Sequence, residues 1–195
     1  MTIDLNDAET QRDRTLIPSG VYCLRITVKP GGAGPDGCLR QARNSRSLML
    51  ELECTVANGE HANRKVWDYI TLEFDQSKRD DLPPVGSDKL EKYRTSVRMG
   101  RTKLRAIIDS AYQLQPNNDS EAARAKRRLE RYDVLNGLTF YAQIESKPGG
   151  NGYGPRNYID FIITPDLPDW PMQPAQVITP FRRSAAADMD DEIPF

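Results

Sequence analysis

The chain has 195 residues, a formal net charge of −1, 38% hydrophobic residues and 28% charged residues, which is typical of one domain with appendages. It contains no apolar run near the ~20 residues of a membrane span, and its first residues lack the basic and apolar segments of a secretion signal. Its three cysteines are scattered, so we expect no disulfide framework and a cytoplasmic location.

Three strands are predicted first, after a polar and flexible segment over 1–15. Apolar and polar side chains alternate over 20–29, 48–56 and 64–74, as in strands with one face in a core. The residues predicted to face the core are Tyr22, Leu24, Ile26, Val28, Leu48, Leu50, Leu52, Cys54, Val56, Val66, Ile70, Leu72 and Phe74. Residues 30–47 form a long glycine-rich loop, and loops of this length are usually functional or disordered.

Two helices are predicted next, after a charged loop. The first covers about 89–114, and a break near Gly100 is left open. The second covers about 120–133, with Asp119 or Ser120 as its N-cap. The residues predicted to face the core are Leu104, Ile107, Ile108 and Ala111 on the first helix, and Ala122, Ala125, Leu129 and Tyr132 on the second.

Two more strands, over 138–145 and 156–163, complete the predicted body, with a glycine-rich hairpin loop over 146–155 between them. Three strands, a helical crossover and two strands are the element order of an OB-fold, a five-stranded Greek-key barrel. We therefore predict a mostly β protein. Its parts are an OB-fold domain over 16–164 with a two-helix insertion at about 87–134, a proline-rich linker over 165–187 and an acidic tip over 188–195.

Charge is unevenly distributed along the chain. Residues 92–131 hold eleven Lys or Arg and four Asp or Glu, whereas residues 188–195 hold four acids and no base. A basic body with an acidic tail suggests an anionic ligand for the body and a separate role for the tail. The alternative for the basic stretch is a solvated helix face.

A single nucleic-acid strand is bound by cations that follow its phosphates and by aromatic rings that stack on its bases. Lys65, Trp67 and Tyr69 alternate on one strand face, as a stacking platform requires. The other predicted DNA-binding residues are Arg40, Arg43 and Arg46 in the long loop, Tyr141, Lys147, Tyr153 and Arg156 near the last hairpin, and Arg124, Arg127, Arg128 and Arg131 on one face of the second helix. The alternative for Trp67 is that it packs in the core.

Neither a metal site nor a catalytic site is predicted. The candidate metal ligands are Cys23, Cys38, Cys54 and His61. Their spacing lacks the paired pattern of a zinc site. The glycine-rich stretch over 31–34 lacks the Gly-Lys-Ser/Thr ending of a phosphate loop. We therefore expect no cofactor and no enzymatic activity. A two-metal nuclease built from converging acids is left open as an alternative.

The last eight residues join an acidic run to an apolar end. The predicted partner-binding residues are Asp188, Asp190, Asp191, Glu192, Ile193, Pro194 and Phe195. Such a segment can dock its ring in an apolar pocket while a basic side chain pairs with the α-carboxylate. It resembles the acidic tip of bacterial single-stranded DNA-binding proteins, which end in a run of Asp followed by Ile-Pro-Phe. Glu192 replaces an Asp of that pattern, and Met189 replaces an aromatic. The alternative is a solubilising tail.

Short motifs in the body are similar to a family of phage-encoded proteins thought to bind single-stranded DNA. The motifs are Ile17-Pro18-Ser19-Gly20-Val21-Tyr22, Leu48-Met49-Leu50-Glu51-Leu52 and Arg64-Lys65-Val66-Trp67-Asp68. The two resemblances imply a protein that coats single strands in replication, recombination or repair and recruits enzymes through its tip. An adaptor or decoy that binds no DNA is the alternative. The sequence leaves open a homo-oligomer and the choice between DNA and RNA.

Overall fold

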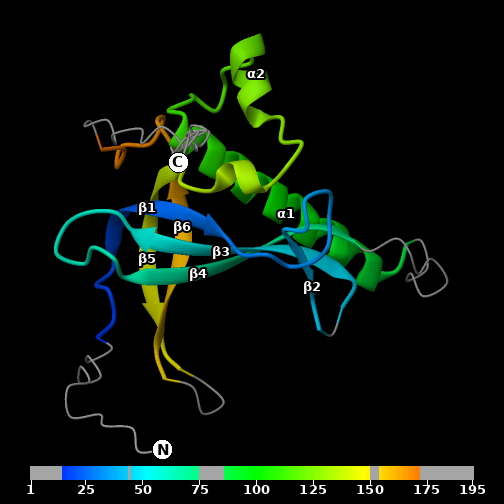
Figure 1. Cartoon of the computed structure of the whole chain (residues 1–195), viewed down its shortest axis with the longest axis horizontal. Helices are drawn as coiled ribbons and strands as arrows, with labels where there is room; N and C mark the ends of the chain where they lie inside the picture. The colour runs from blue at the N-terminus through cyan, green and yellow to red at the C-terminus, as the bar shows by residue number, and fades with distance from the viewer. Residues whose placement is uncertain (1–14, 44, 75–85, 150–153, 172–195) are drawn as a thin grey trace, which may run out of the picture.

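The computed structural model describes residues 15–43, 45–74, 86–149 and 154–171 (Figure 1). Its elements are β1 (Gly20–Val28), β2 (Leu39–Gln41), β3 (Ser47–Val56), β4 (Lys65–Phe74), α1 (Asp88–Ala111), α2 (Glu121–Arg127), the 3₁₀ helix η2 (Asp133–Leu135), β5 (Thr139–Lys147) and β6 (Arg156–Ile163). The predicted mostly β body with two inserted helices is confirmed. Within the described ranges, no helix is both long and apolar enough to cross a membrane.

Several predictions fall outside the described residues. They concern the segment over 1–15 apart from Thr15, the loop residue Tyr153, the linker over 165–187 beyond residue 171, and the whole tip over 188–195. The start of the linker is described and is ordered: the N–H of Trp170 donates to the carbonyl of Leu167 at 3.1 Å.

All six strands form one antiparallel sheet, with the path β2-β3-β1-β5-β6 and β4 on the other side of β3. The first half of β1 pairs with β5 and its second half pairs with β3. Because β1 serves two partners in succession, the sheet turns a corner there. β5 and β6 run across the direction of β3 and β4 in Figure 1. The sheet is open, since among the described residues no ladder joins β4 to β6.

The core lies inside this curved sheet, against α1. Most of the predicted core residues of the strands point inward, and the fully buried ones include Leu24, Ile26, Leu50, Leu52, Cys54, Ile70, Phe140 and Ile144. Burying an aliphatic or aromatic side chain of this size contributes about 1.5–3 kcal/mol. Tyr22, Leu48 and Phe74 are only half-buried at its rim.

Helix α1 is continuous through Gly100, so the break that the sequence left open there does not occur. Gly100 is the point at which the helix touches the sheet, because a Cβ there would lie 1.9 Å from the carbonyl oxygen of Thr71 on β4. The helix begins at Asp88, where the Ser87 side chain accepts the N–H of Leu90. A sequence shows a glycine in a helix, but it does not show that a strand passes against that glycine.

The second predicted helix is too long. The structure confirms Ser120 as the N-cap, but α2 ends at Arg127, and Arg128 is extended with φ −90° and ψ 109°. Ala123 is the buried residue of α2, whereas the predicted Ala122 and Ala125 are exposed. After α2 the chain is held by a distant carboxylate, which accepts two N–H groups at the start of η2.

That carboxylate belongs to Asp36 in the predicted long loop. Its side chain accepts the N–H groups of Tyr132 and Asp133. Partial burial opposes ionisation, but these backbone hydrogen bonds outweigh it and lower the pKa of Asp36. The loop itself is partly regular, since it contains β2 and buries Leu39.

Helix packing at Gly100 is testable by adding one methyl group. We expect Gly100→Ala to lower the free energy of unfolding by about 1–3 kcal/mol through overpacking, although alanine is the better helix former by about 1 kcal/mol. Thr102→Ala, at an exposed position of the same helix, is the matched control and should change stability little. Urea unfolding measures both, and a Gly100→Ala protein as stable as the unchanged one would contradict the contact.

Candidate nucleic-acid interface

The outer surface of β3 and β4 carries exposed aromatic rings on β4. Trp67 and Tyr69 are 49% and 52% exposed, which rules out the alternative that Trp67 lies in the core. Across the ladder Trp67 faces Glu53, and Tyr69 faces Glu51. We call this surface the β3–β4 face; its members are Lys29, Arg40, Glu51, Glu53, Lys65, Trp67 and Tyr69.

Two lysines share one carboxylate on the β3–β4 face. The Nζ atoms of Lys29 and Lys65 each lie 2.7 Å from an Oε of Glu53. Their hydrogen bonds, that of Lys29 first, lower the pKa of Glu53. An ammonium group has three donors, so each lysine can keep this contact and still donate to a phosphate above the face.

Glu51 holds the neighbouring part of the face. Its carboxylate lies 2.6 Å from a guanidinium nitrogen of Arg40 and accepts the Tyr69 hydroxyl at 3.3 Å. The structure therefore brings four predicted residues together on one surface: Arg40, Lys65, Trp67 and Tyr69. Sequence reasoning placed Glu51 and Glu53 on the outer side of their strand but assigned them no role. The antiparallel register across the Asn58-Gly59 turn is the signal that could have paired them with the aromatic residues.

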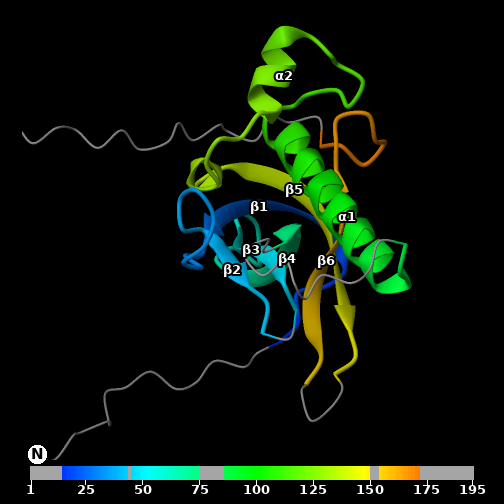
Figure 2. The ribbon, with the colours of Figure 1, turned by 90° about the vertical axis from the view of Figure 1, so that its right-hand side faces the viewer.

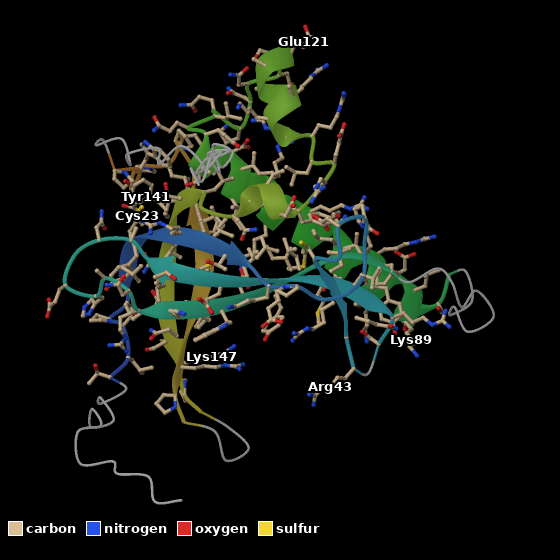
Figure 3. The ribbon with its side chains drawn as sticks, in the orientation of Figure 1. Cys23, Arg43, Lys89, Glu121, Tyr141 and Lys147 are labelled. Atoms are coloured by element: carbon tan, nitrogen blue, oxygen red, sulfur yellow. The ribbon has the colours of Figure 1, made fainter. Side chains whose placement is uncertain are left out.

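Two basic loops project from one side of the body. Arg43 is exposed at the turn between β2 and β3, and Lys147 lies near the end of β5 (Figure 3). Arg156 pairs with Lys147 in the ladder, and the Lys147 Nζ lies 4.9 Å from the centre of the Tyr158 ring. Arg46 is half-buried at the base of the first loop. Figure 2 shows both projections on the same side.

Tyr141 lies elsewhere. It pairs with Cys23 in the ladder, and its ring contacts Trp170 edge-on with ring centres 5.3 Å apart. Burial raises the pKa of the Tyr141 hydroxyl. In Figure 3 it lies at the end of the body opposite Lys147. The structure does not bring Tyr141 beside Trp67. Instead, Trp170, which belongs to the predicted linker over 165–187, packs against the Tyr141 ring.

The four predicted arginines of the second helix do not share one helix face, because α2 ends before Arg128. Arg127 is a structural residue: its Nε lies 2.6 Å from Asp109, and its other nitrogens donate to the carbonyls of Gln115 and Asn118. Arg131 pairs with Asp133. Arg124 and Arg128 are exposed around a shallow pocket that they share with Glu121.

Helix α1 carries a row of arginines to which the sequence analysis assigned no binding role. The spacing i, i+4, i+7, i+11 places four of them on one side of α1. They line a groove of about 550 Å³ together with Phe74 and Val97, and we call it the arginine groove; its arginines are Arg94, Arg98, Arg101 and Arg105. Its described lining contains no acidic side chain, but two of its arginines have acidic partners beside it: Arg94 lies 2.8 Å from Glu91, and Arg105 lies 3.6 Å from Asp109. The signal was present in the helical periodicity of the charges.

Metal-ligating side chains are dispersed in the structure. Across the ranges that the structure describes, no three His, Cys, Asp or Glu side chains are placed to hold a metal ion. Cys23, Cys38 and Cys54 are all buried and free, and burial is the main cause that raises the pKa of the Cys54 thiol.

Comparison with protein-family models finds no match, and comparison with curated proteins finds no similar sequence. The function must therefore be argued from the surfaces described above.

The Glu53 cluster has a testable dependence on pH. Its lowered pKa means that the ionised carboxylate stabilises the fold above its ordinary pKa, and that this contribution is lost as the pH falls through the lowered value. We expect Glu53→Gln to lower the free energy of unfolding near neutral pH and to differ less from the unchanged protein at about pH 3. Urea unfolding at both pH values checks this, with the exposed Glu60→Gln as control. Equal destabilisation at both pH values would show that the ion pairs are not responsible.

Proposed function

We propose that the chain is a non-catalytic protein that binds single-stranded DNA on the β3–β4 face. One observation carries the proposal: Trp67 and Tyr69 are exposed side by side and bordered by Lys29, Lys65 and Arg40. Stacking a base on an aromatic ring contributes about 1–3 kcal/mol, and every base offers such a face. Cations beside exposed rings fit a strand that is gripped without regard to sequence.

We further propose that the sheet is an open variant of the OB-fold. The strand path β4-β3-β1-β5-β6 matches the order of that Greek-key barrel, with β4 and β6 at its unjoined edges. OB-folds bind oligonucleotides on their second and third strands and with the loops of their first and last hairpins. In this chain those strands correspond to β3 and β4; Arg43 lies in the loop before β3, and Lys147 is the last residue of β5, at the base of the other loop. This correspondence supports the choice of the β3–β4 face.

The proposed role is to coat exposed strands during replication, recombination or repair in the bacterial cytoplasm. No catalytic step is required of the protein. The acidic tip, which lies outside the described residues, would recruit enzymes that recognise such tips while the body holds the strand.

A specific observation favours a second candidate. Glu51 and Glu53 lie in the middle of the β3–β4 face, and carboxylates there oppose a polyanion. An adaptor that binds a protein on this face, and does not bind DNA, would not face this repulsion between carboxylates and phosphates. Binding measurements separate the two functions.

Fluorescence tests the proposal directly, because the chain has two tryptophans. In Trp170→Phe, Trp67 is the remaining one, and we expect its emission to be quenched by oligo(dT) but much less by duplex of equal length. Affinity should fall with salt by about 0.7 logarithmic units per phosphate contact. Trp67→Ala should weaken binding by about 1–3 kcal/mol with little loss of stability. Absence of any binding at low salt would favour the adaptor.

The tip is tested separately. We expect deletion of residues 188–195 to abolish capture of enzymes that bind single-stranded DNA-binding proteins, while affinity for oligo(dT) stays equal or rises, because the acids no longer compete with phosphates. The matched control replaces Asp188 by Asn and keeps the apolar end. A further variant adds one residue after Phe195. Capture by that variant at the level of the unchanged chain would show that the α-carboxylate is not recognised.

A further inference from the structure

Exposed apolar side chains gather where β4, α1 and β6 meet. A groove of about 730 Å³ runs there, which we call the seam groove; its main side chains are Tyr69, Met99, Lys103, Asp160 and Phe161. Met99 and Phe161 are 66% and 54% exposed. With Trp67 and Tyr69 they make four of the six large apolar side chains that are exposed among the described residues. Such a concentration of apolar surface is typical of a binding site.

A β-bulge turns Phe161 outward. Ala142 pairs with Ile162 and Ile144 with Ile159, so the β5–β6 register shifts between Gln143 and Ile144. The two isoleucines are buried, whereas Asp160 and Phe161 between them are exposed. Bulges commonly re-aim a side chain beside a functional site. Phe161 was assigned no binding role from the sequence, because the bulge that exposes it is not visible there.

The charges around the seam groove favour an anionic occupant with flat apolar parts. Arg98 lines both the seam groove and the arginine groove, and within the described residues its guanidinium has no ion-pair partner. Lys103 is neutralised by Asp68 at 2.7 Å, and Asp160 adds one negative charge. The four arginines of the arginine groove, with Arg98 among them, extend over about 16 Å of helix at 1.5 Å per residue. An acidic peptide would pair with the arginines, but its carboxylates would offer no planar groups to stack on the rings of Tyr69 and Phe161.

We propose that a single DNA strand stacked on Trp67 and Tyr69 continues into the seam groove, where its next bases pack on Phe161 and Met99 and its phosphates follow the arginine groove. This inference rests on the proposed function. Tyr69 belongs to both surfaces, so the two segments of the path are continuous. The site then covers more nucleotides than the β3–β4 face alone, within the range of about 4–16 nucleotides known for single domains of this type.

Oligonucleotide length separates the two segments. Phe161→Ala should weaken binding of oligo(dT) of about twenty nucleotides by roughly 5- to 100-fold, and binding of about six nucleotides much less. Val134→Ala is the matched control, because Val134 is also 54% exposed but lies on η2. Trp67→Ala should weaken both lengths. Thermal unfolding of each variant confirms that the fold is kept.

A charge variant gives an independent readout. Arg98→Glu should reduce both the affinity for the long oligonucleotide and its salt dependence. Lys126→Glu, which also reverses a positive charge but lies on α2, should change neither. If the unchanged chain binds both lengths and Phe161→Ala binds the long one equally well, the seam groove is not part of the path and the inference is overturned, while the proposed function stands. Loss of self-association in Phe161→Ala, seen by sedimentation without a change in DNA affinity, would also overturn it. If the unchanged chain binds neither length, the proposed function itself fails.

Discussion

Lys103 joins two edges of the sheet that no ladder connects. Its ammonium group lies 2.7 Å from Asp68 on β4 and donates to the carbonyl of Ile159 on β6 at 3.3 Å. The contact requires α1 to lie close to the sheet, which Gly100 permits because it has no side chain between helix and strand. Removing one partner of such a partly buried pair leaves the other charge poorly solvated. The seam groove and the arginine groove are both formed by α1, so both depend on this attachment.

The β3–β4 face is organised by internal ion pairs before any ligand is present. Glu53 and Glu51 orient Lys29, Lys65 and Arg40, so less side-chain entropy is lost when these cations meet a phosphate. The same carboxylates reduce the net positive charge of the face. If the face binds a DNA strand, as proposed, the carboxylates lower its affinity for phosphate while they hold the cations in place.

Local patterns predicted the long strands, because an alternating strand shows its core face within a few residues. Non-local contacts account for the errors. The role of Gly100 was left open because Thr71, which it contacts, is distant in sequence. Arg127 was interpreted as a phosphate contact because Asp109 and the carbonyls it binds are not implied by helix spacing. The grouping of Lys65, Trp67 and Tyr69 was predictable because all three alternate along one strand. The seam groove was not, because its lining comes from β4, α1 and β6 and depends on the bulge in the β5–β6 pairing.

The hydrogen bonds of Asp36 have a consequence for local opening. Its carboxylate accepts the N–H groups of Tyr132 and Asp133, although about a hundred positions separate them along the chain. These amides lose their partner as soon as the glycine-rich loop lifts, so their solvent exchange is governed by that loop and not by the neighbouring helix. The loop after β1 and the segment before β5 therefore belong to one cooperative unit. A ligand that fixes the loop would slow amide exchange in a segment that it never touches.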